Sequence, residues 1–250
     1  MRKVTPPSCR RLRASAVGAP NLTVIAVTST ADARYTDETR LVTLTSVQIR
    51  ELDIPDVYEI TPRQFPDDRG VFYEFYRFDR LAEKVGHPLS LRQGNTSVSR
   101  RGTVRGIHFA QIPPSQAKYV SCLSGAVLDY VIDIRVGSPT FGRWASIVLD
   151  DVDRRSLYIA EGLAHAFVAL SEGAVVSYLV NATFDPEREK GIHPLDEQIG
   201  LRFPEEAGEL LLSPKDTQAP TLAQAQVQGI LPTWSEARSL YSRLDEEAGS

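Results

Sequence analysis

Ionisable side chains stand inside several apolar, strand-like runs of this sequence, where they could move protons on a bound molecule. His108 lies in the run 105–109, Lys118 stands among apolar neighbours after a Pro-Pro turn, and Tyr178 lies in the run 174–180. An imidazole titrates near neutral pH, which suits a general base. Taken singly, a strand histidine is more often structural or exposed, such a lysine is more often solvated, and such a tyrosine is a core residue with a satisfied hydroxyl.

The spacing around His108 favours a ligand site. Strict strand alternation places Arg105 on one face of the strand and both Gly106 and His108 on the other. A glycine beside a histidine on one face would leave room for a ligand to approach. Asp129 lies in an otherwise apolar run, and we expect it to be a paired carboxylate that orients another side chain.

Short β-rich runs separated by Gly and Pro must position these residues. They recur about every ten residues, which is typical of an all-β sandwich or barrel, and the absence of βαβ alternation argues against a Rossmann-type domain. Helical stretches at 79–85 and 235–246 flank them. We predict an all-β, cupin-type double-stranded β-helix (a jelly roll) with short flanking helices. The expected strands are residues 71–75, 93–98, 103–109, 118–123, 126–134, 144–149, 156–159 and 174–180.

Histidine spacing does not favour a metal site in such a barrel. A metal-binding cupin needs two histidines one residue apart with a carboxylate, and another histidine on a later strand. The four histidines are scattered, and no three-histidine set can be assembled from them. We therefore expect neither a metal nor another cofactor. The histidines are His87, His108, His165 and His193.

Composition and charge exclude several classes of function. The net charge is −4, and the basic residues are scattered rather than striped, so nucleic acid is not expected as a partner. No apolar stretch approaches the ~20 residues that span a bilayer. The two cysteines, Cys9 and Cys122, suggest neither a disulfide framework nor a zinc site, and Cys122 reads as a buried thiol. A reducing cytoplasm fits this usage.

Residues 1–48 lack the β-rich pattern that begins at about Ile49. We therefore treat residues 49–250 as the cupin-like domain. The first segment faintly resembles a signal peptide, but its apolar core is short and broken by Thr and Pro. It could instead be a disordered extension. It could also lie upstream of the true start, because Met1 is the only methionine and a non-standard start codon could now be read as Val.

Eight motifs, taken in order, resemble the dTDP-4-dehydrorhamnose 3,5-epimerase family, and the resemblance runs from about Ile49 to the C-terminal helix. So many ordered matches are specific for the family but not for one substrate. The motifs lie at residues 68–74, 92–97, 104–109, 116–118, 131–135, 138–142, 161–167 and 212–216.

The resemblance implies an isomerase that epimerises a dTDP-linked 4-keto-6-deoxyhexose, of the type that converts dTDP-4-dehydro-6-deoxyglucose to dTDP-4-dehydro-L-rhamnose. Protons next to the ketone, at C3 and C5, leave from one face of the sugar and return to the other. His108 matches the family's base and Asp216 the carboxylate that pairs with it. Lys118 matches the residue that stabilises the enolate oxygen, and Tyr178 matches the acid on the far face.

The family also implies a binding shell and a homodimer. Arg69 and Arg105 could bond the diphosphate, and Phe72 could stack on thymine. The strand that carries Arg69 and Glu74 is contributed by the partner subunit in this family, so an exchanged N-terminal strand is implied. The remaining implied binding residues are Gln93, Asn95, His165, Glu189 and Lys215.

One departure from the family pattern leaves open whether one or both carbons are inverted. Where the family has Tyr before Pro, this chain has Phe184. A mono-epimerase acting at C3 or C5 only, as in antibiotic deoxysugar pathways, is therefore an alternative. A 3,4-ketoisomerase would move the carbonyl instead, but Lys118, Tyr178 and Asp216 together argue against it. A sugar-nucleotide-binding cupin without activity is a third possibility.

Overall fold

The computed structural model describes residues 46–113 and 115–249. Cys9 and the interpretations of the first segment, up to residue 45, lie outside the described residues. Within the described part, no helix is both long and apolar enough to cross a bilayer.

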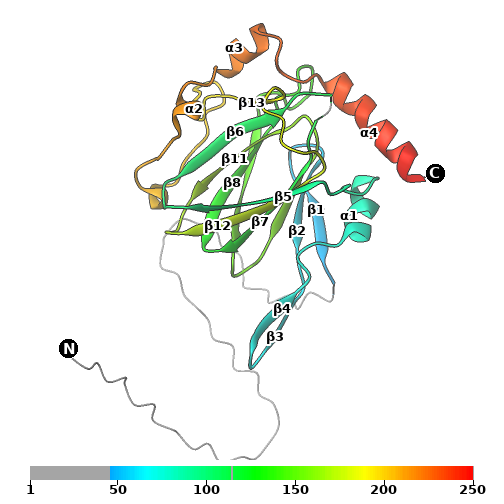
Figure 1. The fold of residues 1–250 in the computed structure, drawn as a ribbon, viewed down its shortest axis with the longest axis vertical. Coiled ribbons are helices and arrows are strands. Elements are labelled where there is room, and N and C mark those ends of the chain that lie inside the picture. Colours follow the sequence, from blue (N-terminus) through cyan, green and yellow to red (C-terminus); the bar gives the residue numbers. More distant parts are fainter. Residues whose placement is uncertain (1–45, 114, 250) are drawn as a thin grey trace, which may run out of the picture. The chain divides into compact units, whose positions relative to one another are not determined.

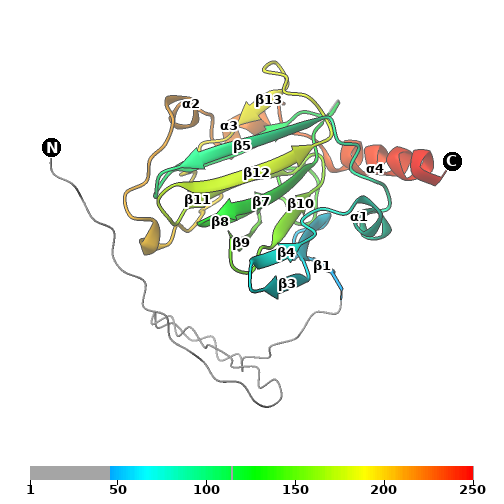
Figure 2. The ribbon, with the colours of Figure 1, turned by 60° about the horizontal axis from the view of Figure 1, so that its bottom comes forward.

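Two antiparallel sheets face each other and form the body of the fold, with a separate hairpin below them (Figures 1 and 2). The predicted jelly-roll architecture is thus confirmed. One sheet has six strands, in the order β1 (Gln48–Glu51), β2 (Val57–Thr61), β10 (Ser156–Ile159), β7 (Lys118–Ser124), β12 (Ala174–Val180) and β5 (Gln93–Ser99). The other has five, in the order β13 (Glu189–Gly191), β6 (Val104–Ala110), β11 (Ala164–Ala169), β8 (Ala126–Ile132) and β9 (Trp144–Asp150). The hairpin pairs β3 (Gln64–Asp67) with β4 (Gly70–Tyr73).

The main apolar core fills the space between the two sheets. Val120 and Leu157 of the six-stranded sheet lie there with Val131 and Phe167 of the five-stranded sheet. A second core covers the outer face of the five-stranded sheet, where the segment after β13 packs its apolar side chains. Both faces of the five-stranded sheet are therefore covered, which explains why β11 is buried along its whole length.

Short helices flank this body. The two predicted helical stretches are confirmed as α1 (Phe78–Val85) and α4 (Trp234–Gly249). Two further short helices, α2 (Pro214–Thr217) and α3 (Leu222–Val227), were not predicted. Ser213 caps α2 and is followed by Pro214 at the first helical position, while Thr221 forms a capping box with Gln224 at the start of α3.

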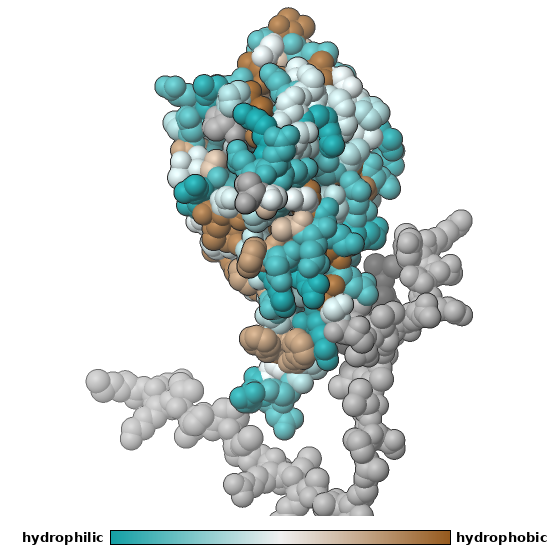
Figure 3. All heavy atoms as spheres, turned by 90° about the vertical axis from the view of Figure 1, so that its right-hand side faces the viewer, coloured by the Kyte–Doolittle hydropathy of each residue, from teal (hydrophilic) through white to brown (hydrophobic). Residues whose placement is uncertain are grey.

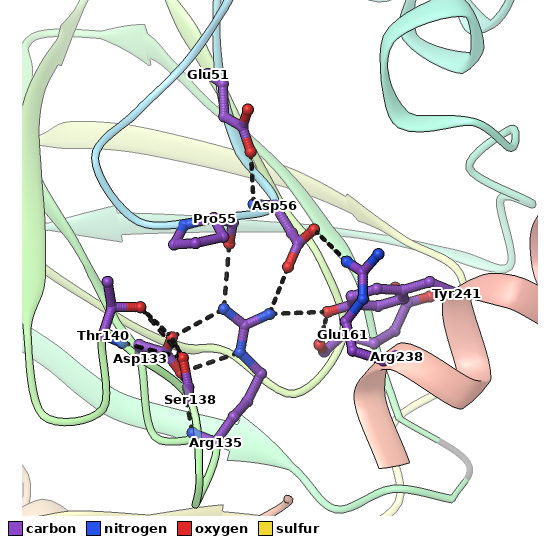
Figure 4. A network of polar contacts seen from close by, with 10 residues as sticks. All are labelled: Glu51, Pro55, Asp56, Asp133, Arg135, Ser138, Thr140, Glu161, Arg238 and Tyr241. Carbon is purple, nitrogen blue, oxygen red and sulfur yellow. Dashed lines mark hydrogen bonds and ion pairs between the residues drawn. The ribbon is translucent and has the colours of Figure 1, made fainter. Parts of the chain in front are cut away.

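A buried arginine joins α4 to the sheets (Figure 4). Arg135 is fully buried, and its guanidinium bonds Asp133 Oδ2 at 2.9 Å, Asp56 Oδ2 at 2.6 Å and the hydroxyl of Tyr241 on α4 at 3.3 Å. Burial works to raise the pKa of Asp133, but the hydrogen bonds from Arg135, Thr140 and Ser138 outweigh it and hold this pKa below its ordinary value. The network fixes three segments that are distant in sequence.

The β3–β4 hairpin projects from the end of the body opposite α2 and α3 (Figures 1 and 2). Its Phe72 side chain is 72% exposed, and Phe65 and Val71 are exposed as well. Seen from the side of α1 and α4, apolar atoms gather along a lower flank of an otherwise largely hydrophilic surface (Figure 3). Exposed aromatic side chains on a projecting hairpin are typical of an interaction surface.

Candidate active site

A cavity of about 530 Å³ lies between the two sheets, within the size range of small-molecule sites. One wall comes from β5, β7 and β12 of the six-stranded sheet. The other comes from β6, β11 and β13 of the five-stranded sheet, and α2 with the segment before it closes the side. Among the residues predicted from the sequence, the cavity brings together Gln93, Asn95, Arg105, His108, Lys118, His165, Tyr178, Glu189, Lys215 and Asp216.

A bulge in β6 places Arg105 and His108 on the same wall, so the expectation that they occupy opposite faces was wrong. His108 pairs with His165 and Arg105 pairs with Phe167 across to β11. Between these pairs β11 advances by two residues and β6 by three, because the ladder is irregular there. The odd residue reverses the alternation, and both side chains line the cavity.

Gly106 does not open space for a ligand, contrary to the expectation from its place beside His108. It is buried against β11, where a Cβ atom would lie 2.4 Å from the Cβ of Ala166. Its φ of +132° is also a conformation that L side chains rarely adopt. The glycine is needed for the close approach of the two strands at the bulge.

His108 and Asp216 form a hydrogen-bonded pair with Nε2 to Oδ1 at 2.7 Å. Asp216 is held by Ser213, whose Oγ donates to Oδ2 at 2.7 Å. Burial works to raise the pKa of Asp216, but the bonds from His108 and Ser213 outweigh it and hold this pKa below its ordinary value. A carboxylate at Nε2 selects the neutral tautomer protonated there, so the lone pair of the imidazole is on Nδ1.

Tyr178 faces this pair from the opposite sheet. On β12 it lies across from Asn95 of β5 and Val120 of β7. Burial raises the pKa of the Tyr178 hydroxyl, with a further upward contribution from the charge of Glu189 and an opposing one from Arg105. The phenol is therefore protonated at neutral pH and can serve as a proton donor.

Lys118 is buried in the cavity wall, which contradicts the interpretation of this residue as a solvated surface lysine. It lies opposite Val180, on the same face of the sheet as Tyr178. Its Nζ donates a hydrogen bond to Gln116 Oε1. Burial lowers the pKa of Lys118 to about 8, and Glu189 partly opposes that effect. The ammonium is thus a cation held in a poorly solvated place.

A second imidazole–carboxylate pair lies beside the first. His165 bonds Asp129 through Nε2 to Oδ2 at 2.8 Å, which confirms that Asp129 is a paired, orienting carboxylate. Asp129 is fully buried, and burial raises its pKa against the influence of His165. Because His165 and His108 are cross-strand partners, the two imidazoles lie next to each other on one wall.

Three predicted binding residues lie on the projecting hairpin or just after it, away from the cavity of their own chain. Arg69 and Phe72 belong to the hairpin, and Glu74 follows it. The Arg69 side chain is 90% exposed and pairs with Asp67, with Nη2 to Oδ2 at 2.6 Å. None of the three lines the cavity that the described residues form.

Phe184 does line the cavity, in the loop after β12. Its backbone N–H donates to Gln93 Oε1 at 2.9 Å, and Gln93 in turn donates to Asn95 Oδ1 at 2.7 Å. This chain of bonds ties the loop to β5. The position where the family pattern has a tyrosine therefore presents a phenyl ring to the ligand space.

Several cavity residues were not singled out from the sequence. Ser97 follows from strict alternation after Gln93 and Asn95, so that signal was present. Phe167 follows in the same way from alternation after His165 on β11, and Val104 begins β6. The others come from loops or from the segment before α2, where no periodic pattern applies. The additional lining residues are Ser97, Arg100, Thr103, Val104, Gln116, Phe167, Leu211, Leu212 and Ser213.

The arrangement suits proton transfer to and from two faces of one bound molecule. A base on one sheet and an acid on the other approach the same space, with a cation at its edge. Among the described side chains, no group of three His, Cys, Asp or Glu residues could hold a metal ion.

Cys122 is buried, as predicted, and burial raises the pKa of its thiol to about 11.

Comparisons with known proteins agree on one family. Residues 51–224 match the family model described as dTDP-4-dehydrorhamnose 3,5-epimerase. The chain is 52% identical over 195 residues to the dTDP-4-dehydrorhamnose 3,5-epimerase of Mycolicibacterium smegmatis, which covers 78% of this chain and 96% of that relative.

Solved structures give the same picture. NovW, a 4-keto-6-deoxy sugar epimerase from the novobiocin biosynthetic gene cluster of Streptomyces spheroides, superposes with a TM-score of 0.75 at 51% identity, over 77% of this chain and 96% of NovW. ChmJ, a 3'-monoepimerase from Streptomyces bikiniensis in complex with dTDP-quinovose, superposes with a TM-score of 0.75 at 39% identity, over 78% of this chain and 98% of ChmJ.

Proposed function

The chain belongs to the dTDP-4-dehydrorhamnose 3,5-epimerase family, and on that basis we propose that it epimerises a dTDP-linked 4-keto-6-deoxyhexose with His108 as base and Tyr178 as acid. The enzyme class is isomerase. The observation that carries the residue assignment is that these two side chains line one cavity from opposite sheets.

The proposed reaction moves one proton off the sugar and one proton on. Nδ1 of His108 takes a proton from a carbon next to the ketone, and the C–H electron pair moves into an enolate whose charge lies on the carbonyl oxygen. Lys118 stabilises that oxygen, and Asp216 stabilises the imidazolium. Tyr178 then gives a proton to the opposite face of the same carbon, which inverts it.

The binding shell follows the polar lining of the cavity. Arg105 and Lys215 supply positive charge for the diphosphate, and Arg105 can offer a forked pair of donors. Asp129 holds Nε2 of His165. His165 can therefore bond the ligand through Nδ1. Gln93, Asn95 and Glu189 supply further polar contacts for the nucleotide sugar.

We further propose a homodimer in which the hairpin of one subunit completes the site of the other. Arg69, Phe72 and Glu74 lie away from the cavity of their own chain, yet match the family's ligand residues. The exposed aromatic side chains of the hairpin suit burial against a second copy, and β5 is the last strand of its sheet among the described residues, next to the cavity. A reducing cytoplasm suits the free, buried thiol of Cys122.

Exchange with deuterated water tests the proposed reaction. The protein is incubated with dTDP-4-keto-6-deoxyglucose, and deuterium at C3 and C5 is followed by proton NMR. Wild type should incorporate deuterium and form the inverted sugar, His108→Ala should do neither, and His193→Ala, outside the cavity, should match wild type. Absence of exchange at both carbons in the wild type would reject the proposal.

Single epimerisation is a second candidate, favoured by Phe184 on the cavity wall and by the likeness to a 3'-monoepimerase. A phenyl ring offers no proton where a tyrosine could. The same NMR experiment separates the two outcomes, because a mono-epimerase inverts one carbon only.

A further inference from the structure

The ammonium group of Lys118 has one hydrogen-bond partner among the described residues, and that partner carries no charge. Its Nζ donates to Gln116 Oε1, and no carboxylate of the described chain lies within ion-pair distance of it. An ammonium has three donors, so two remain free to point into the cavity.

Both ends of the Gln116 amide are in use. Its Nε2 donates to the carbonyl oxygen of Ala182 at 3.2 Å and lies 3.5 Å from Glu189 Oε1. Two acceptors on the nitrogen side fix which way the amide points, so its oxygen must face Lys118. Gln116 is itself buried, which limits its freedom to turn away.

The same stretch of chain is tied to the strand that carries the acid. The backbone N–H of Ala117 donates to Asn181 Oδ1 at 2.8 Å, and Asn181 Nδ2 donates to Glu161 Oε1 at 2.7 Å. Gln116 and Ala117 are thus both anchored to residues 181–182, directly after β12. The position of Lys118 is therefore set relative to Tyr178 on that strand.

A carboxylate in place of the amide would have a different effect on the cation. It would pair with the ammonium and cancel much of the charge that an oxyanion in the cavity would meet. An amide oxygen accepts the bond and leaves the net charge intact. The charged and titratable groups that line the cavity with Lys118 are Tyr178 on β12, Glu189 on β13, Arg105 and His108 on β6, His165 on β11, Lys215 and Asp216 on α2, and Arg100.

We propose that Gln116 is the positioning residue of Lys118: its neutral amide fixes the ammonium toward the ligand without neutralising it. The consequence for catalysis rests on the proposed function, whereas the hold on the ammonium does not. Gln116 contacts the cation directly and would act on the reaction through it.

Two substitutions of similar size test this in opposite directions. Gln116→Glu adds a countercharge, and Gln116→Met removes all hydrogen bonds of the amide. Gln226→Glu, on the exposed surface of α3, makes the same charge change away from the cavity and serves as control. The pKa of Lys118 is measured from the pH dependence of its acetylation by acetic anhydride, followed by peptide mass spectrometry.

We expect the Lys118 pKa near 8 in wild type and in the control. It should be at least about 1 higher in Gln116→Glu, because an opposite charge favours the ammonium, and about 1 lower in Gln116→Met, because the acceptor is lost. Equal values in all four proteins, or shifts of both Gln116 variants in one direction, would overturn the inference.

Turnover provides the second readout. In Gln116→Glu, kcat should fall by roughly 10- to 100-fold with KM nearly unchanged, since removing one preorganised donor commonly costs about 10²–10³ in kcat. A shifted pKa with wild-type kcat would overturn the catalytic consequence. If wild type itself shows no deuterium exchange, the proposed function fails, and the acetylation measurement still decides whether Gln116 holds Lys118.

Discussion

Asp216→Asn is the most informative single change, because the present bond to Ser213 favours one orientation of the new amide. Ser213 has one hydroxyl proton. Its Oγ accepts from the backbone N–H of Asp216 at 3.1 Å and donates that proton to Oδ2 at 2.7 Å. An asparagine that keeps the bond donated by Ser213 would place its oxygen toward Ser213 and its NH₂ group toward Nε2 of His108.

An NH₂ group at Nε2 reverses the tautomer of the base. The imidazole must then present a lone pair at Nε2 and carry its proton on Nδ1, where the proposed abstraction takes place. A comparable wrong-tautomer change in another His–Asp pair costs about 10⁴ in kcat. We expect a loss of roughly 10³–10⁴, or about 4–5 kcal/mol of transition-state stabilisation.

A second change should restore part of the loss. In Ser213→Ala/Asp216→Asn no hydroxyl proton dictates the amide orientation, so the oxygen can turn to accept from Nε2. Deuterium incorporation measured by NMR should then be about tenfold faster than in Asp216→Asn alone. Ser213→Ala alone should lose about 1 kcal/mol of stability as a helix cap but little activity. Activity of Asp216→Asn within tenfold of wild type, or a double variant no faster than it, would refute the tautomer argument.

Three further outcomes are expected. Tyr178→Phe should form inverted product about 10²–10⁴-fold more slowly, while deuterium still enters the substrate without inversion; NMR separates the two, and inversion at the wild-type rate would exclude Tyr178 as the acid. Above about pH 8, kcat should fall as Lys118 loses its proton, whereas Lys118→Arg should show no such fall; a wild-type profile that stays flat to pH 10 would contradict this. Arg135→Met should lower the free energy of unfolding in urea by about 3–5 kcal/mol, because Asp133 and Asp56 lose their buried partner; a loss under about 1 kcal/mol would mean that the network contributes little.

Strand positions were predictable where local pattern and turn chemistry agree. The runs 156–159 and 174–180 are rich in β-branched and aromatic residues, and they form β10 and β12 with the predicted bounds. Strands β1, β2, β3, β11 and β13 were not predicted. β11 is six residues long. The other four are three to five residues long, and β3 contains Pro66. Such short strands exist because a neighbouring strand pairs with them, which is not encoded in their own residues.

The geometry of the site was less accessible than the identity of its residues. The burial of Lys118 depends on β12 and β13, which come later in the chain, and no local signal reports it. Arg105 was assigned to the wrong face because a bulge reverses alternation without changing composition. The position of Asp216 depends on a short capped helix after a long irregular segment, so only the family resemblance pointed to it.

The bulge in β6 makes this strand sensitive to local backbone shape as well as to residue type. Straightening the strand between Arg105 and His108 at constant length would restore plain alternation and turn one of the two side chains out of the cavity. Deleting one residue there would instead leave two residues on each strand between the pairs, so both side chains would stay on the cavity face. Descendants of this chain can therefore lose the bulge only together with one residue of β6, because a substitution that straightens the strand without shortening it would separate the two side chains.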